Sequence, residues 1–151
     1  MIKEIKNKDE KRAVSRSILE SLREWFEVDE SREKFISESA DQLFIAAEED
    51  GRYVGFLTLK ETGNATVELA VMGVLKEYHR KGIGRQLFEM AREAARSQGY
   101  SFMQVKTVAM GKYPDYDKTN LFYIGCGFRE FEMIPELWDE DNPCQIYVTA
   151  L

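Results

Sequence analysis

The sequence has very few histidines and cysteines, the residues that most often bind zinc. Its 151 residues include one histidine and two cysteines. Cys126 and Cys144 form no Cys-x-x-Cys pair, and His79 cannot complete a zinc site with them at any usual spacing. We therefore expect no metal centre. We also expect two reduced cysteines in or near the core, because disulfides are rare in cytosolic proteins.

Long apolar segments are absent as well. No apolar run approaches the roughly 20 residues that span a bilayer. The N-terminal stretch MIKEIKNKDEKR has no apolar segment of the kind that a signal peptide needs. These absences predict a cytoplasmic protein with no membrane partner.

An excess of positive charge is also missing. The formal net charge is −6, and the basic residues are mostly interleaved with acids. A nucleic-acid binder usually shows a basic face, so we expect no nucleic-acid partner. The local exception is HRKGIGR, residues 79–85. One short basic loop on an acidic chain favours a small anionic ligand.

The organisation of the chain is simple. We find no internal repeat, no low-complexity segment and no linker rich in Pro, Gly or Ser. With 44% hydrophobic residues, the chain has enough apolar side chains for one core. We therefore expect one domain over residues 1–151, with the possibility of a homodimer.

The N-terminal third predicts a strand and two helices. MIKEIK is typical of a short edge strand. Apolar residues then recur at helical spacing and predict a helix from about Lys8 to Glu27, capped by Asn7. A second, shorter helix is expected over residues 29–40.

Three strands should follow. Residues 42–60 read as a hairpin, because Asp50-Gly51 favours a turn in which both central residues have positive φ. Residues 62–64 suggest the next turn. Residues 65–74 are mostly apolar, as in a strand covered on both faces. A glycine near the end of this strand, Gly73, indicates a bulge or a close approach to the backbone.

The last elements complete an α/β (α+β) fold. A helix after the glycines should end at Gly99. Its apolar face is expected to comprise Ile83, Leu87, Met90, Ala91 and Ala94. A strand at 100–108 and a helix at 117–124 should follow. Two final strands, at 128–134 and 144–150, bracket an acidic loop. The order β-α-α-β-β-β-α-β-α-β-β predicts a mixed sheet of about six or seven strands with helices on both faces.

The pair Gly82 and Gly84 lies where the helix after the fourth strand should begin. The first turn of a helix has unpaired N–H groups and a partial positive charge. Removing side chains there lets a phosphate sit directly on those donors. A Gly-x-Gly pair also serves in ordinary tight turns, and here it completes neither a Walker loop nor a Rossmann fingerprint.

Two motifs together resemble the GNAT acetyltransferase superfamily. VELAVMGVLKEYHRKGIGRQLFEMARE is similar to the family's acyl-CoA-binding segment, with its [Q/R]-x-x-G-x-[G/A] loop between a strand and a helix. TNLFYIGCGF is similar to a second signature, Tyr-x-x-x-Gly-Phe. The first loop position is His79, where the family usually has Gln or Arg. The expected element order matches the GNAT fold over nearly the whole chain.

The resemblance implies acetyl-CoA as the cofactor and an amine as the acceptor. The residues implied to bind the cofactor are Met72, Gly73 and Val74 for the pantetheine arm, the loop of His79, Arg80, Lys81, Gly82, Ile83, Gly84 and Arg85 for the pyrophosphate, and Asn120 and Tyr123. The Val74 N–H is the candidate to polarise the thioester carbonyl.

The implied catalytic residues are Tyr123 and Glu68. Tyr123 would be the general acid, and Glu68 the base that acts on the amine through water. Each also has a simpler interpretation, as a packed helix-end tyrosine and as a surface glutamate near a strand end. Cys126 is disfavoured as a nucleophile, because family members mostly transfer the acyl group directly.

The sequence therefore predicts an acetyl-CoA-dependent N-acetyltransferase, an acyltransferase acting on a small molecule or a protein amino group. Two alternatives remain open: a binding or sensing module for acyl-CoA with the same fold, and a nucleotide-binding regulator. The acceptor is not specified. Its candidate lining residues are Trp25, Phe26, Tyr113, Tyr116, Trp138 and the acids near Glu140.

Overall fold

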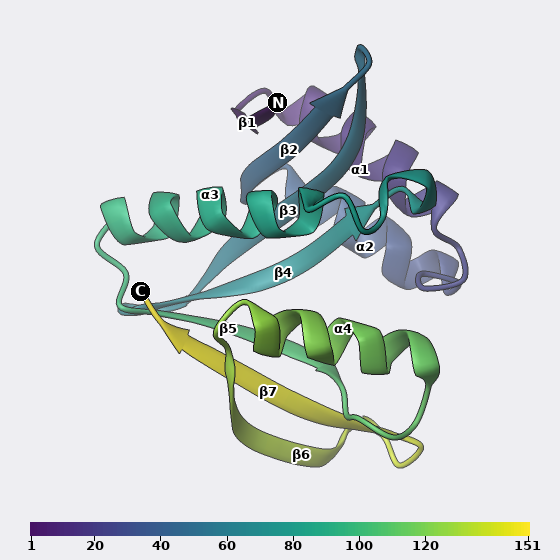
Figure 1. Cartoon of the computed structure of the whole chain (residues 1–151), viewed down its shortest axis with the longest axis vertical. Helices are drawn as coiled ribbons and strands as arrows, with labels where there is room; N and C mark the ends of the chain where they lie inside the picture. The colour runs from purple at the N-terminus through teal and green to yellow at the C-terminus, as the bar shows by residue number, and fades with distance from the viewer. The chain divides into compact units, whose positions relative to one another are not determined.

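The computed structural model describes all 151 residues and contains seven strands and four helices (Figure 1). The strands form one mixed sheet with the hydrogen-bonding order β1-β2-β3-β4-β5-β7-β6. The predicted element order is therefore confirmed. The chain divides into two compact units, residues 1–60 with 70–94 and residues 61–69 with 95–151.

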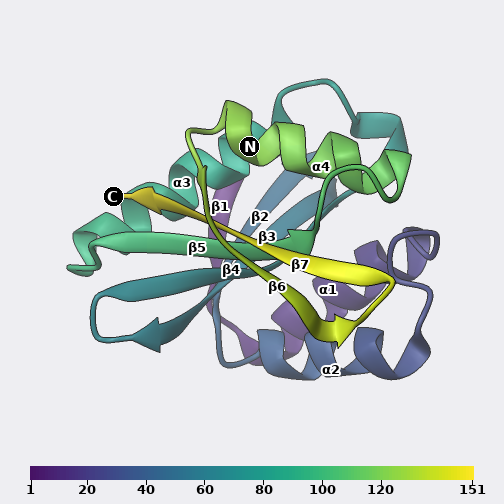
Figure 2. The ribbon, with the colours of Figure 1, turned by 90° about the horizontal axis from the view of Figure 1, so that it is seen from below.

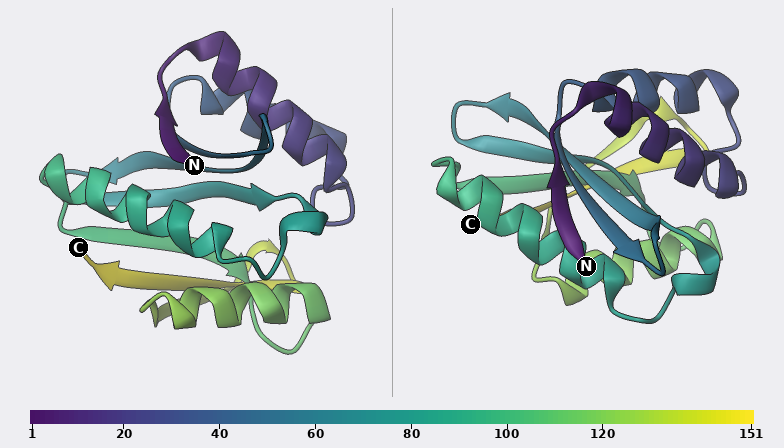
Figure 3. Two further views of the ribbon diagram at one scale, coloured as in Figure 1. Left: turned by 45° about the horizontal axis from the view of Figure 1, so that its top comes forward. Right: turned by 90° about the horizontal axis from the view of Figure 1, so that it is seen from above.

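The first unit places helices on both faces of its strands. Its strands are β1 (Ile2–Ile5), β2 (Leu43–Glu49), most of β3 (Arg52–Gly63) and the end of β4 (Thr66–Val74). Figure 3 shows α1 (Lys8–Ser21) and α2 (Asp29–Ser39) on one face and α3 (Ile83–Ser97) on the other. The predicted β2–β3 hairpin is confirmed, since Asp50 and Gly51 have φ values of 52° and 79°.

Helix α1 begins as predicted but ends earlier. The Asn7 side chain accepts a hydrogen bond from the Glu10 N–H at 2.9 Å, which caps the first turn. The predicted end at Glu27 is wrong, because the helix stops at Ser21. The N–H groups of Trp25 and Phe26 both donate to the Leu22 carbonyl. The apolar residues that follow Ser21 thus keep a helical spacing in the sequence, although they lie in tight turns after the end of the helix.

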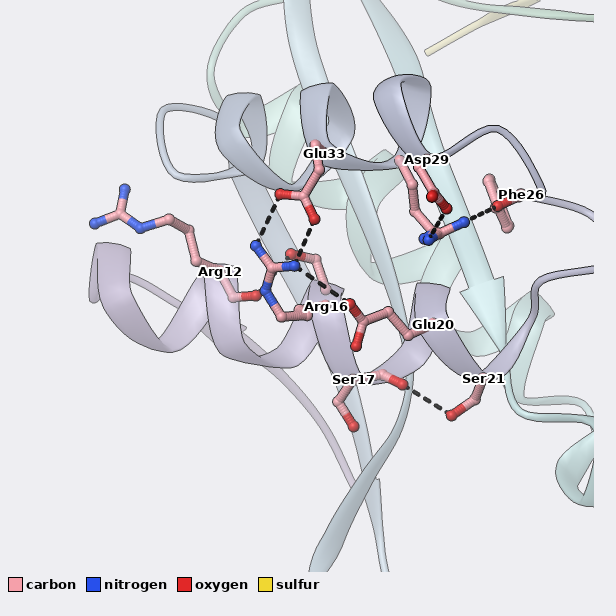
Figure 4. A network of polar contacts seen from close by, with 10 residues as sticks. Arg12, Arg16, Ser17, Glu20, Ser21, Phe26, Asp29 and Glu33 are labelled. Atoms are coloured by element: carbon pink, nitrogen blue, oxygen red, sulfur yellow. Dashed lines mark hydrogen bonds and ion pairs between the residues drawn. The ribbon is translucent and has the colours of Figure 1, made fainter.

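A bidentate ion pair joins helices α1 and α2 (Figure 4). The Arg16 guanidinium donates to both carboxylate oxygens of Glu33, at 2.6 and 2.9 Å. Arg32, buried at the start of α2, donates to the Phe26 carbonyl at 2.7 Å and to Asp29. These contacts hold the segment between the two helices in place. The sequence of that segment contains no residues typical of turns.

The buried face of α3 differs from the predicted one. Ile83, Leu87 and Ala91 are buried as expected, but Met90 is exposed and Ala94 is only half-buried. Phe88 and Ala95 are buried in their place. The end of α3 follows the sequence, because Gly99 has a φ of 91° and its N–H bonds to the Arg96 carbonyl.

Two glycines let the elements of the first unit pack closely. A Cβ atom on Gly73 would lie 3.1 Å from the Leu22 side chain and 3.2 Å from that of Ile18, on α1. A Cβ on Gly55 would lie 3.2 Å from the Gly73 carbonyl oxygen and 3.3 Å from Leu87, on α3. The predicted close approach at Gly73 is therefore confirmed, and it comes from α1.

The Gly55→Ala substitution is expected to lower the free energy of unfolding by about 1–3 kcal/mol, as overpacking does. The new methyl group meets a backbone oxygen, which cannot rotate away. Gly63→Ala is the matched control in the same strand, because a Cβ there meets nothing within 4 Å. Urea denaturation measures both. Equal midpoints for the two variants would contradict the close approach at Gly55.

The second unit contains the start of β4, together with β5 (Phe102–Val108), β6 (Arg129–Asp139), β7 (Asn142–Ala150) and α4 (Pro114–Gly125). Strands β4 and β5 run parallel, with Thr66 opposite Phe102 and Glu68 opposite Gln104. Figure 2 shows α4 lying along β5 and β7.

Three boundaries in this unit correct the sequence analysis. The turn before β4 is at 64–65 rather than 62–64, because β3 continues to Gly63. Helix α4 begins at Pro114, where proline suits the first helical position. The expected acidic loop is mostly strand, because β6 runs to Asp139 and turns at 140–141. β6 is an edge strand and so tolerates Pro135, which cannot donate a ladder hydrogen bond.

None of the helices is both long enough and apolar enough to cross a lipid bilayer. Both cysteines are buried, and neither forms a disulfide, as predicted.

Candidate active site

The predicted loop from His79 to Arg85 comprises a loop, residues 79–82, and the first turn of α3, which begins at Ile83 and so includes Gly84. A short 3-10 turn, η1 (Lys76–Tyr78), precedes it. Within the loop, Arg80 and Gly82 have positive φ values, 62° and 80°. Positive φ is uncommon outside glycine and strains the backbone locally at Arg80. Such a bent backbone turns successive N–H groups toward one concave side, which is how proteins build small anion sites.

The space around Gly82 is open. A Cβ atom there would meet nothing within 4 Å, so packing inside the protein does not explain the glycine. The Gly82 carbonyl accepts the first helical hydrogen bond, from the Gln86 N–H at 3.1 Å. The N–H groups of the first helical turn therefore point outward past a residue without a side chain.

Cationic side chains surround this helix start. Arg80, Lys81 and Arg85 are all exposed. The Lys81 ammonium lies 5.2 Å from the centre of the Tyr78 ring, and Arg85 pairs with Glu89 at 3.2 Å. Positive φ, open space and positive charge meet at one helix N-terminus, which is chemistry suited to a phosphate.

The end of β4 lies beside this loop in the same unit. Met72 and Val74 are half-buried, and Gly73 is buried. The Val74 carbonyl accepts a hydrogen bond from the His79 ring at 2.6 Å. The next N–H along the chain, that of Leu75, donates to the Val54 carbonyl at 2.8 Å. The structure thus brings the predicted strand segment and the predicted loop together.

Tyr123 lies in the last turn of α4, and the second motif forms the helix cap. Gly127 has a φ of 100°. Its N–H donates to the Ile124 carbonyl and the Phe128 N–H to the Tyr123 carbonyl, both at 3.0 Å. This pair of bonds is a Schellman motif, which commonly brings together side chains on either side of the cap. Accordingly, the rings of Tyr123 and Phe128 lie 5.6 Å apart. The spacing Tyr-x-x-x-Gly-Phe therefore fixes the position of the tyrosine.

The Tyr123 ring is buried among other aromatic rings. Its neighbours are Phe122, Phe128 and Tyr147, with ring centres 5.6–6.2 Å away. Burial raises the pKa of Tyr123 well above its usual value of 10, with smaller contributions from Cys126 and Tyr116. The phenol is therefore protonated at neutral pH and able to donate a proton or a hydrogen bond.

The Asn120 side chain lies one turn before Tyr123 and has no exposed surface. Its NH₂ group donates to the Val108 and Tyr116 carbonyls at 2.9 and 2.6 Å. Its oxygen accepts from the Tyr147 hydroxyl at 2.6 Å. All these partners are protein groups, so the carboxamide ties α4 to β5 and β7.

Glu68 on β4 is buried and paired with a residue that the sequence analysis missed. The Lys106 ammonium lies 2.8 Å from its carboxylate. Lys106 is two residues beyond Gln104, which is opposite Glu68, so strand alternation placed it on the same face. Buried Cys144 lies nearby, and burial raises the pKa of its thiol. Glu68 is therefore part of an ion pair, not a solvated surface carboxylate.

The residues suggested for the acceptor belong to both units. In the first unit, the Trp25 ring meets His79 edge-on at 5.9 Å, and Phe26 meets Phe35. In the second, Tyr113 and Tyr116 are 5.9 Å apart, while Trp138 and Glu140 lie at the exposed end of β6 and its turn. No group of three or more His, Cys, Asp or Glu side chains is arranged to hold a metal ion.

The fold and this geometry agree with the comparison against known families. Residues 11–118 match the acetyltransferase (GNAT) family. The chain belongs to that family. The GNAT match covers β2–β5 and α3, including the whole loop at the start of α3. A comparison with curated proteins found no match.

Solved structures show the same fold at low sequence identity. A protein of Desulfovibrio desulfuricans described as a GNAT acetyltransferase is 19% identical, with a TM-score of 0.84 over 99% of this chain and 98% of its own. An IAA acetyltransferase from Bacillus cereus is 23% identical, with a TM-score of 0.79 over 100% and 99%. An aminoglycoside 6'-N-acetyltransferase complexed with coenzyme A is 17% identical, with a TM-score of 0.74 over 99% and 96%. This GNAT chain therefore has the family's fold throughout.

Proposed function

We propose that the chain is an acetyl-CoA-dependent N-acetyltransferase, folded as a single catalytic domain, that moves an acetyl group directly to a primary amine. The observation that carries this proposal is the open, electropositive start of α3 in a chain of the GNAT family. Family membership supports acetyl transfer. The solved relative with coenzyme A bound supports the choice of cofactor.

The first unit has the features needed to hold the diphosphate part of the cofactor. In the proposal, the N–H groups at the start of α3 bind the pyrophosphate, with Arg80, Lys81 and Arg85 adding charge. The open space at Gly82 leaves room for that group. Met72, Gly73 and Val74 contact the pantetheine arm, and the Val74 N–H polarises the thioester carbonyl. The cofactor itself supplies the activated acetyl group.

Tyr123 and Glu68 are the proposed proton carriers. The amine nitrogen forms a bond to the acetyl carbon, and the carbon–sulfur bond breaks. The Tyr123 phenol gives its proton to the departing thiolate, whose conjugate acid has a pKa of about 8.5 if cysteine is a guide. Glu68, which pairs with Lys106, takes a proton from the amine through water. We propose an indirect part for Asn120, which holds the helix that carries Tyr123.

The acceptor in this proposal is a small molecule or a protein amino group. The aminoglycoside acetyltransferase among the structural neighbours supports small amines as the first compounds to test. A homodimer and a cytoplasmic location remain predictions from the sequence.

Calorimetry and a thiol-release assay test the proposal together. Coenzyme A is titrated into the protein, and acetyl-CoA is then incubated with polyamines, aminoglycosides, amino acids and N-terminal peptides. We expect heat on binding and release of free thiol with at least one class. Binding without thiol release from any amine would favour an acyl-CoA sensor. No heat from a folded protein would contradict cofactor binding altogether.

A further inference from the structure

The His79 ring faces the backbone of its own chain. Its Nε2 atom lies 2.6 Å from the Val74 carbonyl oxygen. A carbonyl oxygen only accepts, so Nε2 must carry the hydrogen and donate it. The backbone N–H of His79 is also engaged, donating to the Lys76 carbonyl at 3.1 Å. The His79 ring is therefore hydrogen-bonded to the end of β4, the strand that precedes the loop.

The bond acts on one peptide unit that is held at both ends. The Val74 carbonyl and the Leu75 N–H belong to the same planar peptide. His79 holds the carbonyl, and the Val54 carbonyl accepts from the N–H at 2.8 Å. Val54 lies at a bulge, where the β2–β3 register skips a residue, so its carbonyl reaches the end of β4. The peptide where β4 ends is thus clamped from two directions.

The ring is itself supported from the side. Trp25 meets it edge-on, with ring centres 5.9 Å apart. The Lys76 ammonium lies 5.6 Å from the centre of the Trp25 ring and pairs with Glu24. These contacts limit rotation of the imidazole toward the open space beside the loop.

We propose that His79 is a positioning residue that clamps the Val74–Leu75 peptide, and that it does not bind the cofactor's phosphates. The proposal rests on the proposed function, in which Val74 orients the thioester. It also accounts for histidine where the family usually has Gln or Arg, since all three side chains carry an N–H donor. A neutral donor suffices for a clamp, whereas a phosphate contact would favour a cation.

Three variants separate the two roles: His79→Leu removes the donor, His79→Gln keeps a neutral one, and Lys81→Leu removes a nearby cation. We expect His79→Leu to speed hydrogen exchange at the Leu75 amide at least tenfold. It should lower kcat for thiol release about tenfold, with the Kd of coenzyme A changed less than threefold. His79→Gln should restore both properties. Lys81→Leu should weaken coenzyme A binding and leave exchange at Leu75 unchanged.

Hydrogen exchange at the Leu75 amide and the NMR signals of the His79 ring can both be measured without any enzymatic activity. His79 is the only histidine, so its ring signals in a ¹H–¹⁵N spectrum need no assignment. A clamped Nε2–H should be visible and exchange slowly with water, and it should disappear in His79→Leu. Unchanged Leu75 exchange in His79→Leu would overturn the proposal. So would a loss of coenzyme A affinity in both His79→Leu and His79→Gln that a fourth variant, His79→Lys, restores. Failure of the wild type to bind coenzyme A would refute the proposed function while leaving the clamp measurable.

Discussion

The Tyr123→Phe variant is expected to release thiol from acetyl-CoA about 100- to 1,000-fold more slowly than the wild type. General acids contribute about 10²–10⁴-fold to catalysis, and phenylalanine keeps the ring while removing the proton. The ring contacts with Phe122, Phe128 and Tyr147 should survive, because they involve the ring and not the hydroxyl. The Kd of coenzyme A should therefore change little.

The pH dependence of this reaction follows from the burial of the same phenol. Burial raises the pKa of Tyr123 above 10, so the acid form persists as the pH rises to that value. The rate of the wild type should show no loss from ionisation of Tyr123 below about pH 10. A rate profile from pH 6 to 9.5 measures this.

Tyr100→Phe is the matched control for the loss of a phenol. Tyr100 lies at the surface, where its hydroxyl donates to Glu61 at 2.9 Å. We expect its thiol-release rate to equal that of the wild type. If Tyr123→Phe also retained the full rate with the best amine, Tyr123 would be only a packed helix-end residue.

Asn120→Ala should lower the free energy of unfolding by about 3 kcal/mol. A buried polar group left without its partner costs about 1–3 kcal/mol. This substitution removes a hydrogen-bond partner from more than one buried polar group. The Tyr147 hydroxyl loses its acceptor, and the Val108 and Tyr116 carbonyls lose a donor. Thermal or urea unfolding measures the loss.

A double-mutant cycle shows whether the effect comes from this network. Tyr147→Phe removes the stranded hydroxyl, so the double variant with Asn120→Ala should lose less than the sum of the two single variants. Asn142→Ala is the control for loss of an asparagine, because that amide bonds only near the surface, to Asp139. It should cost less than about 0.5 kcal/mol. Additive single effects would contradict the proposed coupling of Asn120 to Tyr147.

Local signals in the sequence predict most of the elements but not all of their boundaries. The Asp50-Gly51 turn and the Gly99 stop follow from backbone conformations that few other residues adopt. Two ends without such a residue, those of α1 and β6, were predicted wrongly. Apolar spacing continues past Ser21 through tight turns, and β6 extends past Pro135 because pairing with β7 sustains it.

The candidate site divides in the same way. The glycine-bearing loop and the Tyr-x-x-x-Gly-Phe cap are continuous in sequence, so their residues could be named from it. The partners of these residues come from distant segments. Lys106 is 38 positions from Glu68, and Tyr147 is 27 positions from Asn120. The register of paired strands and the packing of α4 bring them together.

The sequence by itself determined the family fold, the element order and the bare, basic start of α3, because glycine conformation, apolar spacing and charge act locally along the chain. Only the tertiary structure decided that Asn120 faces inward, that Glu68 is ion-paired and that the His79 ring turns back to Val74. Those contacts depend on which polar groups lie close together in the folded chain. The spacing of residues along the sequence does not specify that proximity.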